Sequence, residues 1–198
     1  RGLDPVSGRS LKALGDPIHA RPSVIVYDAD LDNAGINPDM AIAMTTNHGS
    51  FHLIDAATGN EYFSYTPREE LSLIKKIYGP HPFAPNDAVN RFSVYGLDGS
   101  PLVWLHDNNA DGIVSQADND RVLVYLTQRR GGRNIYALDI TDPGKPAMVW
   151  KTLGGVTAGF GELGQTWSEP QMATIKVGGV GRKVLVFGGG YDDAQDNA

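Results

Sequence analysis

The sequence contains no cysteine, and this absence removes a whole group of functions. Without Cys the chain can form no disulfide, no thiolate metal ligand and no cysteine nucleophile. No run of 18 apolar residues occurs either, so no membrane-spanning segment is expected. Basic residues are the minority, with 17 Lys and Arg against 23 Asp and Glu. The resulting net charge of −6 argues against a nucleic-acid surface.

No signal peptide opens the chain, and its first residues, RGLDPVSGRS, are typical of the interior of a longer sequence. We therefore expect residues 1–198 to be a fragment of a larger protein. Hydrophobic residues make up 41% and charged residues 20% of the chain, which is typical of a globular fold. The 24 Gly and 12 Pro suit a protein with many turns.

Short segments rich in Val, Ile, Tyr, Phe and Trp dominate the chain, and each is bounded by Gly, Asp, Asn or Pro. This pattern predicts strands. They cover residues 23–30, 40–46, 50–56, 61–67, 92–96, 101–107, 121–128, 134–140, 147–153, 171–177 and 183–189. One segment, 67–79, predicts a helix, because Pro67 starts it, two acids follow in its first turn and Gly79-Pro80 ends it. The predicted class is all-β with one short inserted helix.

Two stretches of the chain share one plan. "FHLIDAATGNEYFSY" (51–65) and "IYALDITDPGKPAMVW" (135–150) each run from a strand through Asp and a Gly-containing turn to an aromatic-ended strand. Asp55 and Asp139 are equivalent and lie 84 residues apart, about two repeats of the ~40–45-residue unit of a propeller blade. Each Asp is expected to accept hydrogen bonds from backbone N–H groups two or so residues on. Two unrelated hairpins are the alternative.

Residues 107–118 have the spacing of a Ca²⁺-binding loop. Oxygen donors recur at alternate positions, Gly112 permits a sharp turn, and position 12 holds an Asp where a longer Glu is usual. The predicted ligands are Asp107, Asn109, Asp111, the carbonyl of Ile113 and Asp118. The apolar side chain of Ile113 is expected to pack into the core and hold the loop down. Strands are predicted on both sides, so the loop belongs to a β-hairpin and not to an EF-hand. The alternative is a solvated Asp/Asn turn; Mg²⁺ fits less well, because it keeps its waters.

Other patterns are weaker. The acids of "DADLDNAGINPD" (28–39) have a similar spacing, with Asn33 in place of the Gly, and favour a plain acidic turn over a second Ca²⁺ site. "QRRGGRN" (128–134) is basic and lies between two predicted strands, which favours a solvated turn, with a partner site as the alternative. "GFGELG" (159–164) lacks the strand and helix that a nucleotide loop requires. No catalytic residue and no organic cofactor site is predicted.

Several motifs in order resemble the C-terminal domain of type IV pilus tip adhesins, the PilY and PilC family. They are "AMTTNHGSFHLIDAATGNEYFSYTP", "RRGGRNIYALDITDP", "LGQTWSEPQ" and "FGGGYDDAQD". The resemblance implies a quinoprotein-like β-propeller, of which this chain would be a part, with Ca²⁺ in the 107–118 loop. It also implies transport through the periplasm and outer membrane to the pilus tip. The expected contacts there are minor pilins and a host or abiotic surface, and the expected roles are pilus biogenesis and retraction control, surface attachment and twitching motility.

The resemblance leaves an enzyme as the second reading. Quinoprotein dehydrogenases share the blade plan and use Ca²⁺ with pyrroloquinoline quinone. They commonly carry a vicinal Cys pair, which this chain lacks, and their Ca²⁺ lies in a central funnel, whereas the loop here is a hairpin tip. We therefore predict a protein without catalytic activity. No Arg-Gly-Asp tripeptide is present, so integrin binding is not implied.

Overall fold

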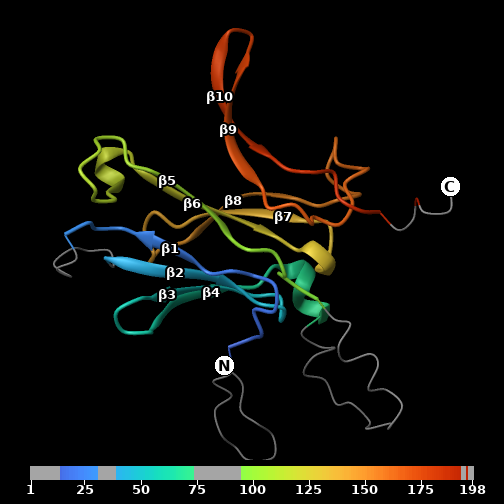
Figure 1. Ribbon diagram of the computed structural model, residues 1–198, viewed down its shortest axis with the longest axis horizontal. Coiled ribbons are helices and arrows are strands. Elements are labelled where there is room, and N and C mark those ends of the chain that lie inside the picture. Colours follow the sequence, from blue (N-terminus) through green and yellow to red (C-terminus); the bar gives the residue numbers. More distant parts are fainter. Residues whose placement is uncertain (1–13, 31–38, 74–94, 193–194, 196–198) are drawn as a thin grey trace, which may run out of the picture.

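The computed structural model describes residues 14–30, 39–73, 95–192 and 195. These residues form ten strands in three antiparallel sheets, with only short helical turns between them (Figure 1). The all-β prediction is confirmed. Two of the sheets have four strands each, joined in simple chain order, and the third is a single hairpin.

The strands lie close to their predicted positions. The first sheet holds β1 (Ser23–Val26), β2 (Met40–Thr45), β3 (Phe51–Asp55) and β4 (Glu61–Tyr65). The second holds β5 (Leu102–His106), β6 (Arg121–Thr127), β7 (Ile135–Asp139) and β8 (Ala147–Thr152). The hairpin holds β9 (Gln171–Val177) and β10 (Val180–Val186). The part of the chain that the structure describes also contains the 3-10 turns η1 (Arg68–Glu70), η4 (Gln116–Asp118) and η5 (Arg129–Gly131).

The repeat inferred from the sequence is present in the structure. The two similar stretches form β3–β4 and β7–β8, the last two strands of their sheets. Both hairpins carry a register shift, between Leu53 and Ile54 in one and between Ala137 and Leu138 in the other. These positions are equivalent, because each precedes the repeated Asp by the same number of residues.

The repeated aspartates end β3 and β7 as predicted. One carboxylate oxygen of Asp55 accepts hydrogen bonds from the N–H groups of Ala57 (2.8 Å) and Thr58 (3.0 Å). Asp139 accepts from the N–H of Thr141 at 2.9 Å. Each bond closes the turn immediately after a strand, where the backbone donors would otherwise lack a partner.

The core lies between the two four-stranded sheets. Alternate residues of β2 and β3 face alternate residues of β6 and β7, as period-2 side-chain placement requires. Fully buried members include Phe51 and Leu53 from the first sheet and Val122, Val124 and Tyr136 from the second. Burial of this apolar surface holds the sheets together.

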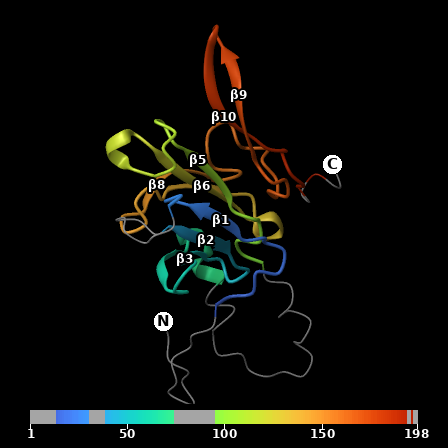
Figure 2. The same ribbon diagram turned by 60° about the vertical axis from the view of Figure 1, so that its left-hand side comes forward.

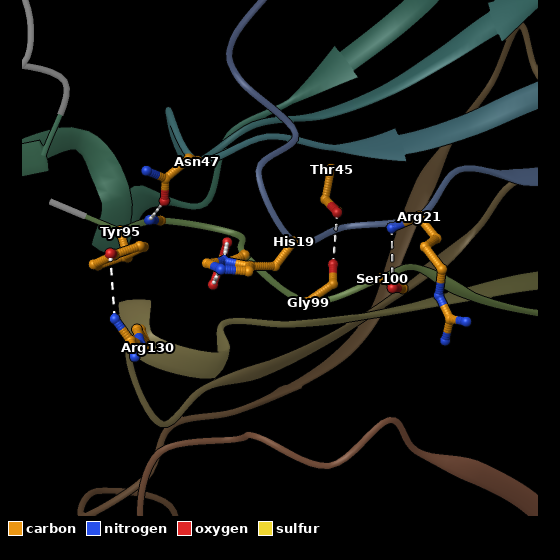
Figure 3. A network of polar contacts seen from close by, with 10 residues as sticks. His19, Arg21, Thr45, Asn47, Tyr95, Gly99, Ser100 and Arg130 are labelled. Carbon is orange, nitrogen blue, oxygen red and sulfur yellow. Dashed lines mark hydrogen bonds and ion pairs between the residues drawn. The ribbon is translucent and has the colours of Figure 1, made fainter. Parts of the chain in front are cut away.

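Polar contacts also join the sheets. The hydroxyl of Tyr27, just after β1, donates to the carbonyl of Ile140 at 2.7 Å in the interior. The Thr45 hydroxyl donates to the carbonyl of Gly99 at 2.6 Å, and His19 contacts the buried Asp98 carboxylate at 2.9 Å (Figure 3). The segment before β1 therefore runs along the segment before β5.

The β9–β10 hairpin projects from the body of the molecule in both ribbon views (Figures 1 and 2). Gly178 and Gly179 form its two-residue turn with φ of 59° and 84°, and Val177 pairs with Val180 across it. This turn type needs positive φ at both central residues. Strand β10 consequently starts at Val180, earlier than the predicted 183, because the sequence expectation placed "GGVGR" outside any strand.

Two other predictions are only partly matched. The helix predicted over 67–79 begins with η1 and continues as α-helix at 71–73, while 74–79 lies outside the described residues. Tyr95 and Gly96 of the predicted strand 92–96 are not in a strand, and 92–94 lies outside the described residues.

Over the described residues the three sheets do not close into a ring. No helix in that part of the chain is long and apolar enough to cross a membrane.

Candidate metal-binding loop

The loop at 107–118 connects β5 to β6, as the sequence predicts, at the end of the second sheet that lies at the far left of Figure 1. It also pairs with the chain just after β1. An isolated antiparallel bridge links Ile113 to Asp28, and the N–H of Val114 donates to the carbonyl of Tyr27 at 2.7 Å. The N–H of Ala29 donates to the carbonyl of Gly112 at 3.1 Å. The loop therefore connects the two four-stranded sheets.

Asp107 organises the first half of the loop. One of its oxygens accepts from the N–H of Ala110 at 2.6 Å and the other from the N–H of Gly112 at 2.8 Å. Gly112 has φ of 83°, a conformation that L-residues with side chains rarely adopt. Its predicted role in the sharp turn is confirmed.

Asn109 and Asp111 lie side by side in the loop. The Asn109 amide donates to an Asp111 oxygen at 2.9 Å, and the Asn109 carbonyl oxygen accepts from the N–H of Asp111 at 3.2 Å. The other Asp111 oxygen accepts from the N–H of Ile113 at 2.8 Å. The three predicted side-chain ligands at positions 1, 3 and 5 thus fold the loop by accepting hydrogen bonds from its own backbone.

Ile113 differs from the expectation in one respect. Its side chain was expected to reach the core, but it is 40% exposed, and Val114 is the buried anchor at 5% exposure. The bridge to Asp28 sets this alternation, because successive side chains of an extended segment point to opposite sides. The carbonyl of Ile113 takes part in neither bridge bond described above, and its role as a ligand stays a prediction.

Two acids close the loop. Asp118, the predicted ligand at position 12, lies in η4, and its backbone carbonyl accepts from the Asn108 amide at 3.1 Å. Asp120 was not predicted. It is fully buried, and its two oxygens accept from the N–H groups of Asn108 (2.8 Å) and Ser115 (2.9 Å). These two backbone hydrogen bonds hold the pKa of Asp120 below its ordinary value.

Asp120 lies outside the 12-position pattern, so the motif could not identify it. The remaining signal was an acid directly before a strand, at a place where backbone donors need a partner. Since its carboxylate joins the start of the loop to the second half, Asp120 is a positioning residue for the predicted ligands.

Within the described ranges, no group of three His, Asp or Glu side chains is already arranged to hold a metal ion. The Asp107 oxygens instead accept backbone N–H groups, and the Asp111 oxygens accept one backbone N–H and the side-chain amide of Asn109. A carboxylate offers about four lone-pair positions, so an oxygen that accepts one N–H can still contact a cation. Calcium binding at this loop stays a prediction, and its ligands would have to draw together around the ion.

The second acidic stretch is only partly described. Asp28 is buried, and one of its oxygens accepts from the N–H of Asp30 at 2.9 Å, which is the plain turn that the sequence favours. Asp39 is also buried. Asp32 and Asn33 lie outside the described residues, so a second cation site at 28–39 stays a prediction.

Comparison with known proteins connects this fold to one group. No family model matches the chain. A type IV pilus biogenesis factor PilY1 homolog from Xylella fastidiosa is 28% identical over 158 residues, which is 77% of this chain. PilY1 from Pseudomonas aeruginosa (strain UCBPP-PA14) is 25% identical over 202 residues, or 93% of the chain. The chain resembles PilY1 over most of its length.

The fold agrees with that resemblance. The crystal structure of the P. aeruginosa PilY1 C-terminal domain matches 78% of this chain with a TM-score of 0.50 and 23% identity. The similarity inferred from the motifs is confirmed. The chain spans only 11% and 16% of the two curated relatives, and 26% of the solved PilY1 chain. What the whole of PilY1 does is therefore not automatically a property of this segment.

Proposed function

We propose that this chain is part of the C-terminal domain of a type IV pilus biogenesis factor, and that its 107–118 loop binds Ca²⁺. The observation that carries the first part is the similarity to PilY1 over 77–93% of the chain. The second part rests on the spacing of Asp107, Asn109 and Asp111 and on the loop geometry that these residues form.

The domain is proposed to be a modified β-propeller. Its support is the repeat: two four-stranded antiparallel sheets in chain order pack face to face, with equivalent hairpins, equivalent register shifts and equivalent turn aspartates. Further sheets of this kind in the longer protein would complete the ring. The exposed β9–β10 hairpin suits the beginning of such a sheet.

Calcium would act at the junction of the sheets. The bonds of the loop to Tyr27 and Ala29 fasten the second sheet to the end of β1. In the absence of a cation, the carboxylates of Asp107, Asp111 and Asp118 repel one another in a short segment, which favours a looser loop. A bound Ca²⁺ would neutralise them and stiffen the junction. This is a physical route by which Ca²⁺ could favour one state of a pilus-associated protein.

The proposed setting is the cell surface. A factor of this kind would be exported through the periplasm and outer membrane to the pilus tip. There it would contact minor pilins and a host or abiotic surface, and act in adhesion, retraction control, twitching motility and virulence. Catalysis is not part of the proposal: the relatives are named as pilus biogenesis factors. Against the quinoprotein dehydrogenase alternative, the candidate Ca²⁺ loop lies at a hairpin tip; a quinone absorbance scan of the purified protein would test it.

Deletion and complementation in the source bacterium test the proposal. Deleting the gene should remove surface pili and twitching, and the full-length gene should restore both. The full-length Asp107→Asn/Asp111→Asn double variant should restore pili but lose the response of twitching to a Ca²⁺ chelator, while Asp16→Asn, an exposed acid outside the loop, should behave as the parent. Normal pili in the deletion strain would contradict the pilus role. An unchanged chelator response in the double variant would contradict the Ca²⁺ role alone.

A further inference from the structure

A basic turn lies at the opposite end of β6 from the candidate metal loop. It spans residues 128–134 and joins β6 to β7, as the sequence predicts. The seven residues of β6 separate the two by about 23 Å at ~3.3 Å per residue. Arg129 in this turn has φ of 47°, in the left-handed region. Such strain at a non-Gly residue persists only where the surroundings impose it, and it concentrates at binding sites.

Aromatic rings order two arginines of this turn. The guanidinium carbons of Arg129 and Arg130 lie 5.2 Å and 5.4 Å from the ring centroid of Trp167. Arg130 also lies 5.4 Å from the ring of Tyr95 and donates to its hydroxyl at 3.3 Å (Figure 3). Stacking occupies the flat faces of a guanidinium and leaves N–H donors on its edges free for a planar anion. Neither arginine forms an ion pair with a carboxylate of the described residues.

A cavity of about 410 Å³ lies beside these side chains. This volume is within the range of small-molecule sites, roughly 300–1,000 Å³. Most of its lining residues are polar, and they include Glu69, Glu70, Tyr95, Arg130, Arg133 and Asn134. Such a wall offers both hydrogen-bond donors and acceptors, so it suits a hydrophilic ligand better than a lipid or another apolar molecule.

The acidic side chains that line the cavity neutralise little of the positive charge of Arg130. Glu69 pairs with the Lys151 ammonium at 2.5 Å. Burial opposes the ionisation of Glu69, but this contact holds its pKa below the ordinary value. Burial raises the pKa of Glu70 to about 7, so much of it is uncharged near neutral pH. Asp192 lies 3.9 Å from a nitrogen of Arg133. Arg130 is thus left with positive charge facing a cavity in a chain of net charge −6.

We propose that this cavity binds an acidic sugar, with the sugar carboxylate on Arg130 and its hydroxyl groups on the polar wall. A sugar of this class carries one carboxylate and several hydroxyls. The hydroxyls can donate to the glutamates and accept from the side-chain amide of Asn134. A ligand with several carboxylates would place negative charge against Glu69, which like-charge repulsion opposes. The proposal is independent of Ca²⁺, because the 107–118 loop lies at the other end of the sheet.

Calorimetric or NMR titration of the purified chain with four probes tests the proposal. They are glucuronic acid, N-acetylneuraminic acid, glucose and a tetraglutamate peptide. We expect saturable binding of at least one acidic sugar, with glucose and the peptide weaker by about tenfold or more. Arg130→Gln should weaken the acidic sugar by at least about tenfold. Arg182→Gln, which removes an exposed arginine of β10, should leave binding unchanged.

A second variant separates a lost contact from a misfolded turn. Arg130→Lys keeps the charge but loses the planar edge, so binding should fall to an intermediate value while the melting temperature stays within a few degrees of the parent. The proposal is overturned if neither acidic sugar binds, if glucose binds as well as they do, or if Arg130→Gln binds like the parent. Preferential binding of the peptide would overturn it in favour of an acidic peptide site.

Discussion

Glu70 is a buried carboxyl group, so we predict that it makes the free energy of unfolding depend on pH. Its side chain is 4% exposed, and one oxygen accepts a hydrogen bond from the amide of Gln128. Burial is the main cause that raises its pKa from 4.5 to about 7; the Gln128 bond opposes the rise, and the nearby Glu69 adds to it. The folded protein therefore favours the neutral form of Glu70.

The sign of the pH dependence follows from this. Below pH 4.5 Glu70 is protonated in both the folded and the unfolded chain, and its ionisation costs nothing. As the pH rises from 4.5 to about 7, the unfolded chain ionises while the folded one resists, so stability falls. Above that range the folded protein carries the buried charge, at a cost of about 3 kcal/mol in the free energy of unfolding.

Glu70→Gln removes this cost and keeps an oxygen that can accept from Gln128. We expect the variant and the parent to be nearly equal in urea unfolding at pH 4, and the variant to be more stable by about 3 kcal/mol at pH 8. At pH 8 the melting temperature should rise by roughly 6–12 °C for a chain of this size. Glu162→Gln, a change at an exposed acid, should show no such trend. Equal stability of Glu70→Gln and the parent at pH 8 would refute the burial argument.

Three further variants test the fold. Tyr27→Phe removes the donor to the Ile140 carbonyl and should lower the free energy of unfolding by about 1–3 kcal/mol in urea titration; no loss would mean that this bond does not join the sheets. Gly179→Ala places a side chain at φ of 84° and should cost roughly 1–2 kcal/mol in the same assay, whereas a neutral result would exclude the two-residue turn. Asp120→Ala should speed amide hydrogen exchange at Asn108, and unchanged exchange would contradict its role in closing the loop.

Local pattern predicted much of this fold. The strands followed from short β-branched and aromatic segments. The repeat followed from the two strands that end in Asp before a Gly-containing turn, and these Asp carboxylates accept backbone N–H groups as expected. The pairing of the 107–118 loop with Tyr27 and Asp28 was not predictable, because its partners lie more than 80 residues apart and are joined by backbone bonds that any residue can make.

The burial of individual side chains was also not predictable from the sequence. Glu70 stands in the first turn of the predicted helix, and nothing in the sequence indicates that its side chain is buried beside Gln128. In the loop, alternation fixed by the Asp28 bridge buries Val114 in place of Ile113. The basic turn was expected to be solvated, and Arg130 is exposed; the stacking of Arg129 and Arg130 on Trp167, more than 30 residues away in sequence, was not predictable.

Calorimetric titration of the purified chain with Ca²⁺ tests the central claim most directly. The account predicts saturable binding at one loop with a Kd between ~10⁻⁶ and ~10⁻³ M. A hundredfold excess of Ca²⁺ over Kd should stabilise the fold by about 2.7 kcal/mol. Asp111→Asn should abolish the binding heat, and Asp16→Asn should retain it. Absence of binding heat in the parent, or an equal heat in Asp111→Asn, would contradict the claim and leave the loop a turn held only by its own hydrogen bonds.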